Sequence, residues 1–189
     1  MAVLRRTAPP RGLLGDLMQR YGETHRHYHT ARHLEQCFAR LDEVQPHAAE
    51  VELALWFHDA IYDTSRHDNE ELSAEWARDC VVPFSSAAAD RVRAMILATR
   101  HRAAPQSEDA KLTVDVDLSI LGASAARFDE YDAQIRREYA WVPPALYRRE
   151  RRRVLEGFLQ RGAIYNTPHF LAHYEAPARA NLQRALARL

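Results

Sequence analysis

The chain has 189 residues, of which 47% are hydrophobic and 28% are charged, values typical of a globular chain and not of a disordered one. Its 26 basic and 26 acidic residues give a formal net charge of zero, so no global field favours a nucleic acid or an acidic membrane as a partner. No apolar stretch approaches the length of a transmembrane helix. The first twelve residues, "MAVLRRTAPPRG", lack the apolar region of a signal peptide. Cys37 and Cys80 lack the CxxC spacing and are interpreted as reduced thiols of a cytoplasmic protein.

Long segments rich in Ala, Leu, Arg and Glu, with only six glycines, favour helices. In "TARHLEQCFARLDEV", the residues Leu34, Cys37, Phe38 and Leu41 form an apolar stripe of helical period. The segment 48–63 is apolar on most sides, as expected of a central helix. Composition, caps and breakers predict helices over 30–44, 48–63, 69–82, 85–101, 124–141, 143–161 and 177–189.

Residues 109–123 are ambiguous, because their apolar and polar alternation also fits a short strand. No repeat, linker or composition break divides the chain. The sequence therefore predicts an all-α fold of about seven or eight helices. We expect one domain over residues 1–189, with a core over roughly 20–162 and a C-terminal helical extension over 163–189.

Histidines concentrate early in the chain, where four of the ten lie between His25 and His33. His29 and His33 are four residues apart, which on a helix places both on one face. Later, His58 and Asp59 end a segment built for the interior. Burying a carboxylate without a partner is costly, so a metal ion is the partner that best explains the pair. The alternative is a solvated His-Asp pair near a helix end.

A third feature is "TVDVDLSILG", which places Asp115 and Asp117 among apolar residues. The order along the chain is H, then HD, then D. Two imidazoles and two carboxylates suit Mn²⁺, Fe²⁺ or Zn²⁺ better than Ca²⁺, which prefers oxygen ligands alone.

This order resembles the HD superfamily of metal-dependent phosphohydrolases. The resemblance covers most of the chain and is closest to a small stand-alone group with segments similar to "RHYHTARHLE", "ELALWFHDAIYD", "DNEELSA", "DVDLSILG" and "REYAWVP". It implies an HD-type helical bundle that binds a divalent metal such as Mn²⁺, Mg²⁺, Fe²⁺ or Zn²⁺. The implied ligands are His33, His58, Asp59 and Asp117. Asp117 is preferred to Asp115 because the last ligand of nucleotide triphosphohydrolase relatives is the second Asp of a D-x-D pair.

The segment "YHTARH" is also similar to the "YHN…H" segment of cyclic-nucleotide phosphodiesterases of the same superfamily. That resemblance makes His33 the metal ligand and His29 the general acid that protonates the leaving oxygen. This chain has Thr30 in place of the Asn. Asp59 is in addition a candidate catalytic residue, which either bridges to a second ion or accepts the proton of the attacking water.

Five further residues are weaker candidates near the substrate or behind the ligands. Arg26 is a candidate phosphate clamp, and Tyr28 a candidate wall of a base or sugar pocket. Glu70 and Glu71 either lie near the metal water or only favour the first turn of a helix. His101 either serves a second metal or a phosphate, or is an ordinary histidine at a helix C-terminus.

These observations predict a metal-dependent phosphohydrolase that uses a metal-activated water on a small nucleotide or related phosphoester or phosphoanhydride. One alternative is a di-iron HD-type oxygenase, which needs more histidine ligands, and His101 is the one evident candidate. Another is a non-catalytic nucleotide-binding sensor. The expected partner is a small phosphorylated substrate and neither a nucleic acid nor a membrane, with a homodimer left open.

Overall fold

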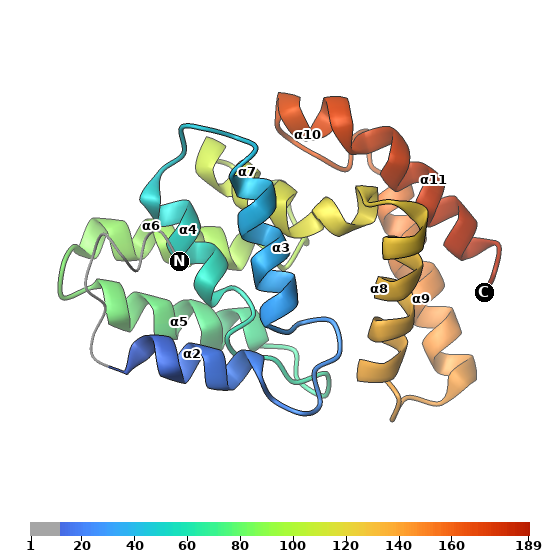
Figure 1. The fold of residues 1–189 in the computed structure, drawn as a ribbon, viewed down its shortest axis with the longest axis horizontal. Coiled ribbons are helices and arrows are strands. Elements are labelled where there is room, and N and C mark those ends of the chain that lie inside the picture. The colour runs from blue at the N-terminus through green and yellow to red at the C-terminus, as the bar shows by residue number, and fades with distance from the viewer. Residues whose placement is uncertain (1–11) are drawn as a thin grey trace. The chain divides into compact units, whose positions relative to one another are not determined.

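The computed structural model describes residues 12–189, and these residues form ten α-helices and one 3-10 helix without any strand (Figure 1). The all-α prediction is therefore confirmed. The segment on which the signal-peptide prediction depends lies, except for its last residue, outside the described residues. The chain forms two compact units, Met1–Asp117 and Leu118–Leu189, which are described separately below. The single domain with an extension from residue 163 stays a prediction.

The first unit is organised around one apolar helix. Its helices are α2 (Leu13–Tyr21), α3 (Ala31–Leu41), α4 (Ala49–Phe57), α5 (Asn69–Val81), α6 (Ser86–Ala98) and α7 (Glu108–Asp117). Helix α4 packs against α3, α5, α6 and α7, and Val51, Ala54 and Leu55 have no exposed surface. The predicted central helix is therefore confirmed, and its burial supplies much of the hydrophobic stabilisation of this unit.

Several helices of the first unit end earlier than predicted, since α3 ends at Leu41 and α6 at Ala98. Helix α4 ends at Phe57 and not at residue 63, because the Ala60 amide donates to the Phe57 carbonyl at 2.9 Å and closes a tighter turn. The ambiguous segment 109–123 is helical, as α7 and the following 3-10 helix. Helix α2 was not predicted, since its nine residues give only a short periodic signal.

The second unit contains the 3-10 helix η1 (Leu118–Gly122) and the helices α8 (Ala125–Glu138), α9 (Pro144–Leu159), α10 (Pro168–His173) and α11 (Glu175–Leu186). Helix α11 packs against η1, α8 and α9. The Asn181 amide donates to the carbonyls of Leu121 and Ala123 at 2.8 and 2.9 Å. These bonds satisfy the end of η1, where backbone acceptors would otherwise lack partners. The six residues of α10 were too few to predict.

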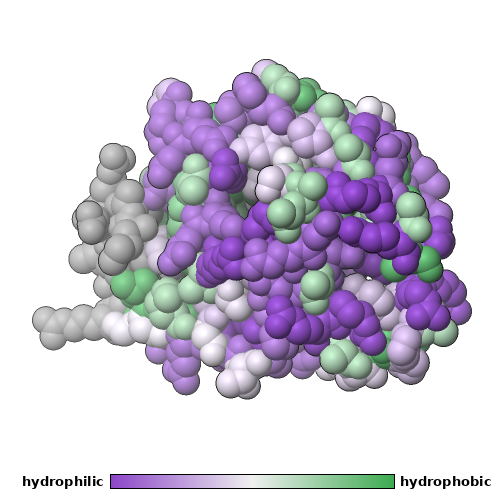
Figure 2. All heavy atoms as spheres, turned by 45° about the vertical axis from the view of Figure 1, so that its right-hand side comes forward, coloured by the Kyte–Doolittle hydropathy of each residue, from purple (hydrophilic) through white to green (hydrophobic). Residues whose placement is uncertain are grey.

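Polar side chains dominate the face drawn in Figure 2, where hydrophobic side chains form small separate groups. Such scattered apolar exposure is ordinary for a folded protein. Within residues 12–189, no helix is both long enough and apolar enough to cross a bilayer.

Gly122 allows the end of η1 to lie directly against α11. A Cβ atom at this position would lie 2.7 Å from the Tyr174 carbonyl oxygen and 2.8 Å from the Tyr174 Cβ. We therefore expect Gly122→Ala to lower the free energy of unfolding by about 1–3 kcal/mol. Gly157→Ala is the matched control, because a Cβ there meets nothing within 4 Å and removing a helical glycine adds roughly 0.5–1 kcal/mol. Urea unfolding of the full chain measures both, and equal effects of the two changes would contradict the packing argument.

Candidate metal centre

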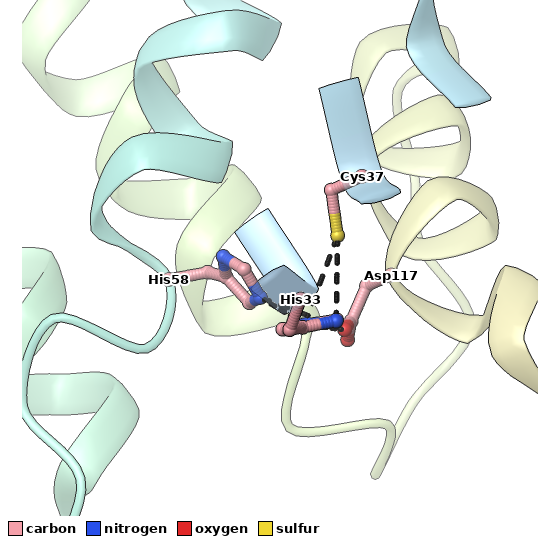
Figure 3. Close-up of side chains that lie close together, drawn as sticks. All are labelled: His33, Cys37, His58 and Asp117. Carbon is pink, nitrogen blue, oxygen red and sulfur yellow. Dashed lines mark hydrogen bonds and ion pairs between the residues drawn. The ribbon is translucent and has the colours of Figure 1, made fainter. Parts of the chain in front are cut away.

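Four side chains from three segments of the first unit converge on one point. His33 lies on α3, His58 and Asp59 directly follow α4, and Asp117 is the last residue of α7. The Nε2 atom of His33 lies 3.2 Å from Nε2 of His58, 3.5 Å from Oδ2 of Asp59 and 3.3 Å from Oδ1 of Asp117. The Nε2 atom of His58 lies 3.0 Å from Oδ2 of Asp59 and 3.5 Å from Oδ1 of Asp117. Figure 3 shows His33, His58 and Asp117 pointing toward one another. The structure thus brings together the four residues predicted as ligands.

A hydrogen bond from Nδ1 to the backbone fixes which ring nitrogen of the neutral His58 carries the hydrogen. Nδ1 lies 2.8 Å from the Leu55 carbonyl oxygen, which can only accept, so Nδ1 carries a hydrogen. In the neutral ring Nε2 then presents a lone pair, the arrangement typical of a metal-bound histidine. That lone pair faces Oδ2 of Asp59, which is buried and accepts no hydrogen bond from the described residues. Two electron-rich atoms 3.0 Å apart require a cation between or beside them.

The spacing of these atoms fits a bound ion. Metal–ligand bonds of about 2.0–2.2 Å at tetrahedral or octahedral angles place neighbouring ligand atoms about 2.9–3.5 Å apart. The distances among the four side chains run from 3.0 to 3.5 Å. Two neutral imidazoles and two carboxylates also carry a formal charge that one divalent ion would cancel. The residues present therefore fit a divalent metal.

Electrostatics in the metal-free cluster place protons where the ion would bind. Burial works to lower the pKa of both imidazoles, but neighbouring polar groups that include the two carboxylates raise the pKa of His33 and His58 well above the usual value. Burial works to raise the pKa of both carboxylates, but the surrounding imidazoles hold the pKa of Asp59 and Asp117 well below the usual value. Since a metal needs neutral imidazoles, protons compete with it and its affinity falls as the pH falls.

Arg26 shapes the turn that presents His58 and Asp59. Its side chain has no exposed surface, and its guanidinium donates to the carbonyls of Asp59 at 2.6 Å and Ala60 at 3.1 Å. It also donates to the His29 carbonyl at 3.1 Å and to Glu23 at 3.0 Å. These acceptors use the hydrogen-bond donors of the guanidinium, so the Arg26 side chain holds the backbone of this turn in place. The sequence interpretation of Arg26 as a phosphate clamp does not agree with this placement.

The segment "DNEELSA" anchors the same turn from the other side. The Ile61 amide donates to Ser73 Oγ at 2.9 Å. The Asp63 amide donates to Asn69 Oδ1 at 3.1 Å, and the Asn69 side chain donates back to the Asp63 carbonyl at 2.8 Å. Asn69 and Ser73 were not predicted as supporting residues. Their position shortly after the HD pair was the available signal, although that spacing alone does not identify a backbone anchor.

His29 lies beside the cluster but not on the helix of His33. Helix α3 begins at Ala31, after the extended Thr30, so the inference that both histidines share a helical face is wrong. The His29 ring stacks on Tyr62 with a centroid distance of 4.1 Å and lies 5.8 Å from the His33 ring. Its nearness also contributes to the low pKa of Asp59. His29 therefore reaches the cluster from the loop before α3, and not from the helix that carries His33.

His101 contacts the second oxygen of Asp117. Its Nε2 lies 3.0 Å from Asp117 Oδ2, while Oδ1 of the same carboxylate faces His33 and His58. His101 has a φ of 56°, a left-handed conformation that costs free energy in a residue with a Cβ atom. Arg100 next to it pairs with Glu71 of α5 at 2.8 Å, which holds this segment in place.

The other weaker candidates lie around the cluster without joining it. Burial, with the charges of Asp59 and Glu71, raises the pKa of Glu70. Glu71 is engaged by Arg100. Tyr28 is 4% exposed, and its ring lies 4.6 Å from the His33 ring. Tyr28 therefore packs against a proposed ligand, and its role in a base or sugar pocket stays a prediction.

Cys37 also belongs to the cluster and was not predicted there. The sequence places it on the apolar stripe of its helix, and its buried thiol lies 3.7 Å from both ring nitrogens of His33. One ligand atom from each of His33, Cys37, His58 and Asp117 lies within 4.8 Å of all the others (Figure 3). Its spacing of four residues from His33 was the only sequence signal.

Comparisons of the chain with protein-family models, with curated proteins and with solved structures gave no significant match. The likeness to the HD superfamily therefore stays a prediction from the motifs, and the geometry of the cluster is the independent observation.

We predict that Arg26→Lys lowers the free energy of unfolding by about 2–4 kcal/mol, because one ammonium cannot replace a buried fork on several acceptors. Arg66→Lys is the control, since Arg66 is about half exposed and pairs only with the nearby Asp68. Denaturant unfolding with and without Mn²⁺ measures the effect. An Arg26→Lys protein of unchanged stability would show that the buried guanidinium does not support this turn.

Proposed function

We propose that this chain is a metal-dependent phosphohydrolase of the HD type, acting on a small nucleotide or a related phosphoester or phosphoanhydride. The observation that supports this best is the convergence of His33, His58, Asp59 and Asp117, whose donor atoms lie 3.0–3.5 Å apart in a buried cluster. Ligands of this kind and in this chain order are those that the HD motif requires. A reducing, cytoplasmic setting suits the two free cysteines.

In this proposal His33, His58, Asp59 and Asp117 hold one divalent ion. When bound, such an ion lowers the pKa of a water ligand toward neutrality and polarises a phosphoryl oxygen. The protein supplies a buried, preorganised set of donors, so little reorganisation opposes the reaction. Arg26 and Asn69 fix the turn after α4 and thereby keep Asp59 aimed at the cluster.

His29 is the proposed proton donor to the leaving oxygen. Its ring is partly exposed, stacks on Tyr62 and lies 5.8 Å from the His33 ring. Histidine is the side chain that most often serves as a general acid, and in this proposal His29 donates the proton without being a metal ligand. Asp59 is the proposed acceptor of the proton from the attacking water.

We predict that the purified chain releases phosphate or pyrophosphate from members of a nucleotide panel when Mn²⁺ is added, and that Asp59→Ala abolishes the release. The reason is the loss of a ligand that is also the proposed base. Asp63→Asn is the matched control, because Asp63 lies in the same turn but is exposed, and its side chain accepts from the Ser65 amide and hydroxyl. Metal content after dialysis is measured in parallel. A folded, metal-loaded protein that is inert across the panel would contradict the enzymatic proposal, and nucleotide binding without turnover would favour the sensor.

We predict that His29→Gln lowers kcat by about 10²–10⁴-fold, the usual contribution of general acid catalysis, while the bound Mn²⁺ is retained. His67→Gln is the control, because His67 is an exposed histidine in the turn that follows the HD pair. Loss of metal together with activity in His29→Gln would assign His29 to the ligands and remove it as the proton donor.

A di-iron oxygenase is the second candidate, and one observation favours it. Asp117 presents Oδ1 to His33 and Oδ2 to His101, an arrangement that suits a carboxylate shared by two ions. Anaerobic purification with iron analysis separates the candidates, because a mixed-valent iron pair and a single Mn²⁺ ion give different paramagnetic resonance signals. A hydrolase that retains full activity after His101→Gln would count against the second ion.

A further inference from the structure

The thiol of Cys37 lies where a metal ligand would lie. Cys37 follows His33 by one helical turn, so both side chains project from the same face of α3. Cys37 is 1% exposed. Its Sγ atom lies 3.7 Å from Nδ1 and 3.7 Å from Nε2 of His33. In Figure 3 it points toward the same centre as His33, His58 and Asp117.

The distances suit coordination by sulfur. Zinc bonds of about 2.3 Å to sulfur and 2.0–2.1 Å to nitrogen separate the two ligand atoms by about 3.5 Å at a tetrahedral angle. The observed separation of 3.7 Å from His33 Nε2 is close to this value. The candidate ligand atoms of Cys37, His33, His58 and Asp117 all lie within 4.8 Å of one another. Side-chain movements of about 1 Å that bring these four atoms to about 3.5 Å from one another would complete a set of two nitrogens, one sulfur and one oxygen.

Cys37 and Asp59 are therefore alternative fourth donors of different chemical character. Both can join His33, His58 and Asp117, since Asp59 Oδ2 lies 3.0 Å from His58 and the thiol lies beside His33. Thiolate is a soft ligand that favours Zn²⁺ and Cd²⁺, whereas carboxylate favours Mg²⁺ and Mn²⁺. A site that offers both donors can bind the two classes of ion in two different ways.

Resting on the metal site of the proposed function, we infer that Cys37 is a metal ligand for zinc-class ions. Zn²⁺ or Cd²⁺ is bound by His33, His58, Asp117 and the Cys37 sulfur, while Mn²⁺ or Mg²⁺ is bound with Asp59 in its place. On binding of the soft ion, the S–H bond breaks, a sulfur–metal bond forms, and the proton passes to solvent. The choice of ion thus decides whether Asp59 or Cys37 completes the site.

The test is a Cd²⁺ titration of the metal-free, reduced full-length chain, followed by the ultraviolet charge-transfer band of the cadmium–thiolate bond. The wild-type chain and Cys80→Ser should both give this band, because Cys80 lies on α5 and is not among the clustered donors. Cys37→Ser should lose it. In the same protein the Zn²⁺ affinity should fall about 10–100-fold while the Mn²⁺ affinity stays unchanged. The ¹¹³Cd resonance of the wild-type chain should lie downfield, in the range of sulfur ligation, which needs no variant.

Several results would overturn the inference. A band that survives in Cys37→Ser, or that disappears in Cys80→Ser instead, assigns the sulfur ligand elsewhere. Cadmium that binds the wild-type chain without a band and with a resonance of nitrogen and oxygen ligation makes Cys37 only a packing neighbour of His33. In that case loss of Cd²⁺ and Mn²⁺ binding in His33→Asn still supports the proposed function. Metal binding that is unaffected by His33→Asn removes the metal site itself, and the proposed function fails with it.

Discussion

The whole site depends on one electrostatic constraint, which is that lone pairs buried face to face need positive charge among them. His58 Nε2 and Asp59 Oδ2 lie 3.0 Å apart, with His33 and Asp117 close on either side. Protons satisfy this constraint in the absence of metal, as the raised pKa of the imidazoles indicates. A divalent ion satisfies it better, since it contacts all four atoms at once and cancels both carboxylate charges. Because of this constraint, the cluster costs free energy to bury without positive charge and is suited to binding a cation.

The surrounding fold holds the donors in place through contacts with backbone. Arg26 occupies the carbonyls of the turn after α4, and Ser73 and Asn69 of α5 bind that turn from the other side. The ion pair between Glu71 and Arg100 ties α5 to the segment of His101. The turn that carries His58 and Asp59 is therefore attached to α5 and to the segment before α3 by polar groups that are not proposed ligands themselves. Such supporting contacts would hold the proposed ligands in a fixed geometry whether or not a metal ion is bound.

The sequence predicted the parts of this protein whose signal is local. Long amphipathic helices, the buried α4 and the chain order of His33, His58, Asp59 and Asp117 could all be recognised from spacing and residue type. The helical conformation of 109–123 could not, because alternation in so short a segment fits both strand and helix. The role of Arg26 was misassigned for a different reason. A guanidinium binds phosphate and backbone carbonyls equally well, and only the tertiary fold decides which acceptors reach it.

Cys37 is a second residue whose contacts in the fold could not be predicted from the sequence. A buried cysteine is both a small hydrophobic residue and a metal ligand, so its place on the apolar stripe of α3 satisfies the helical pattern completely and leaves no sign of a second role. What distinguishes the two roles is the position of nitrogen atoms from a helix far away in the sequence. Because His58 directly follows α4 and Asp117 ends α7, the packing of these helices against α3 places the Cys37 thiol beside three candidate ligands. If the sulfur binds, the metal preference of this site follows from helix packing and from the residue one turn beyond His33, and not from the H, HD and D positions alone.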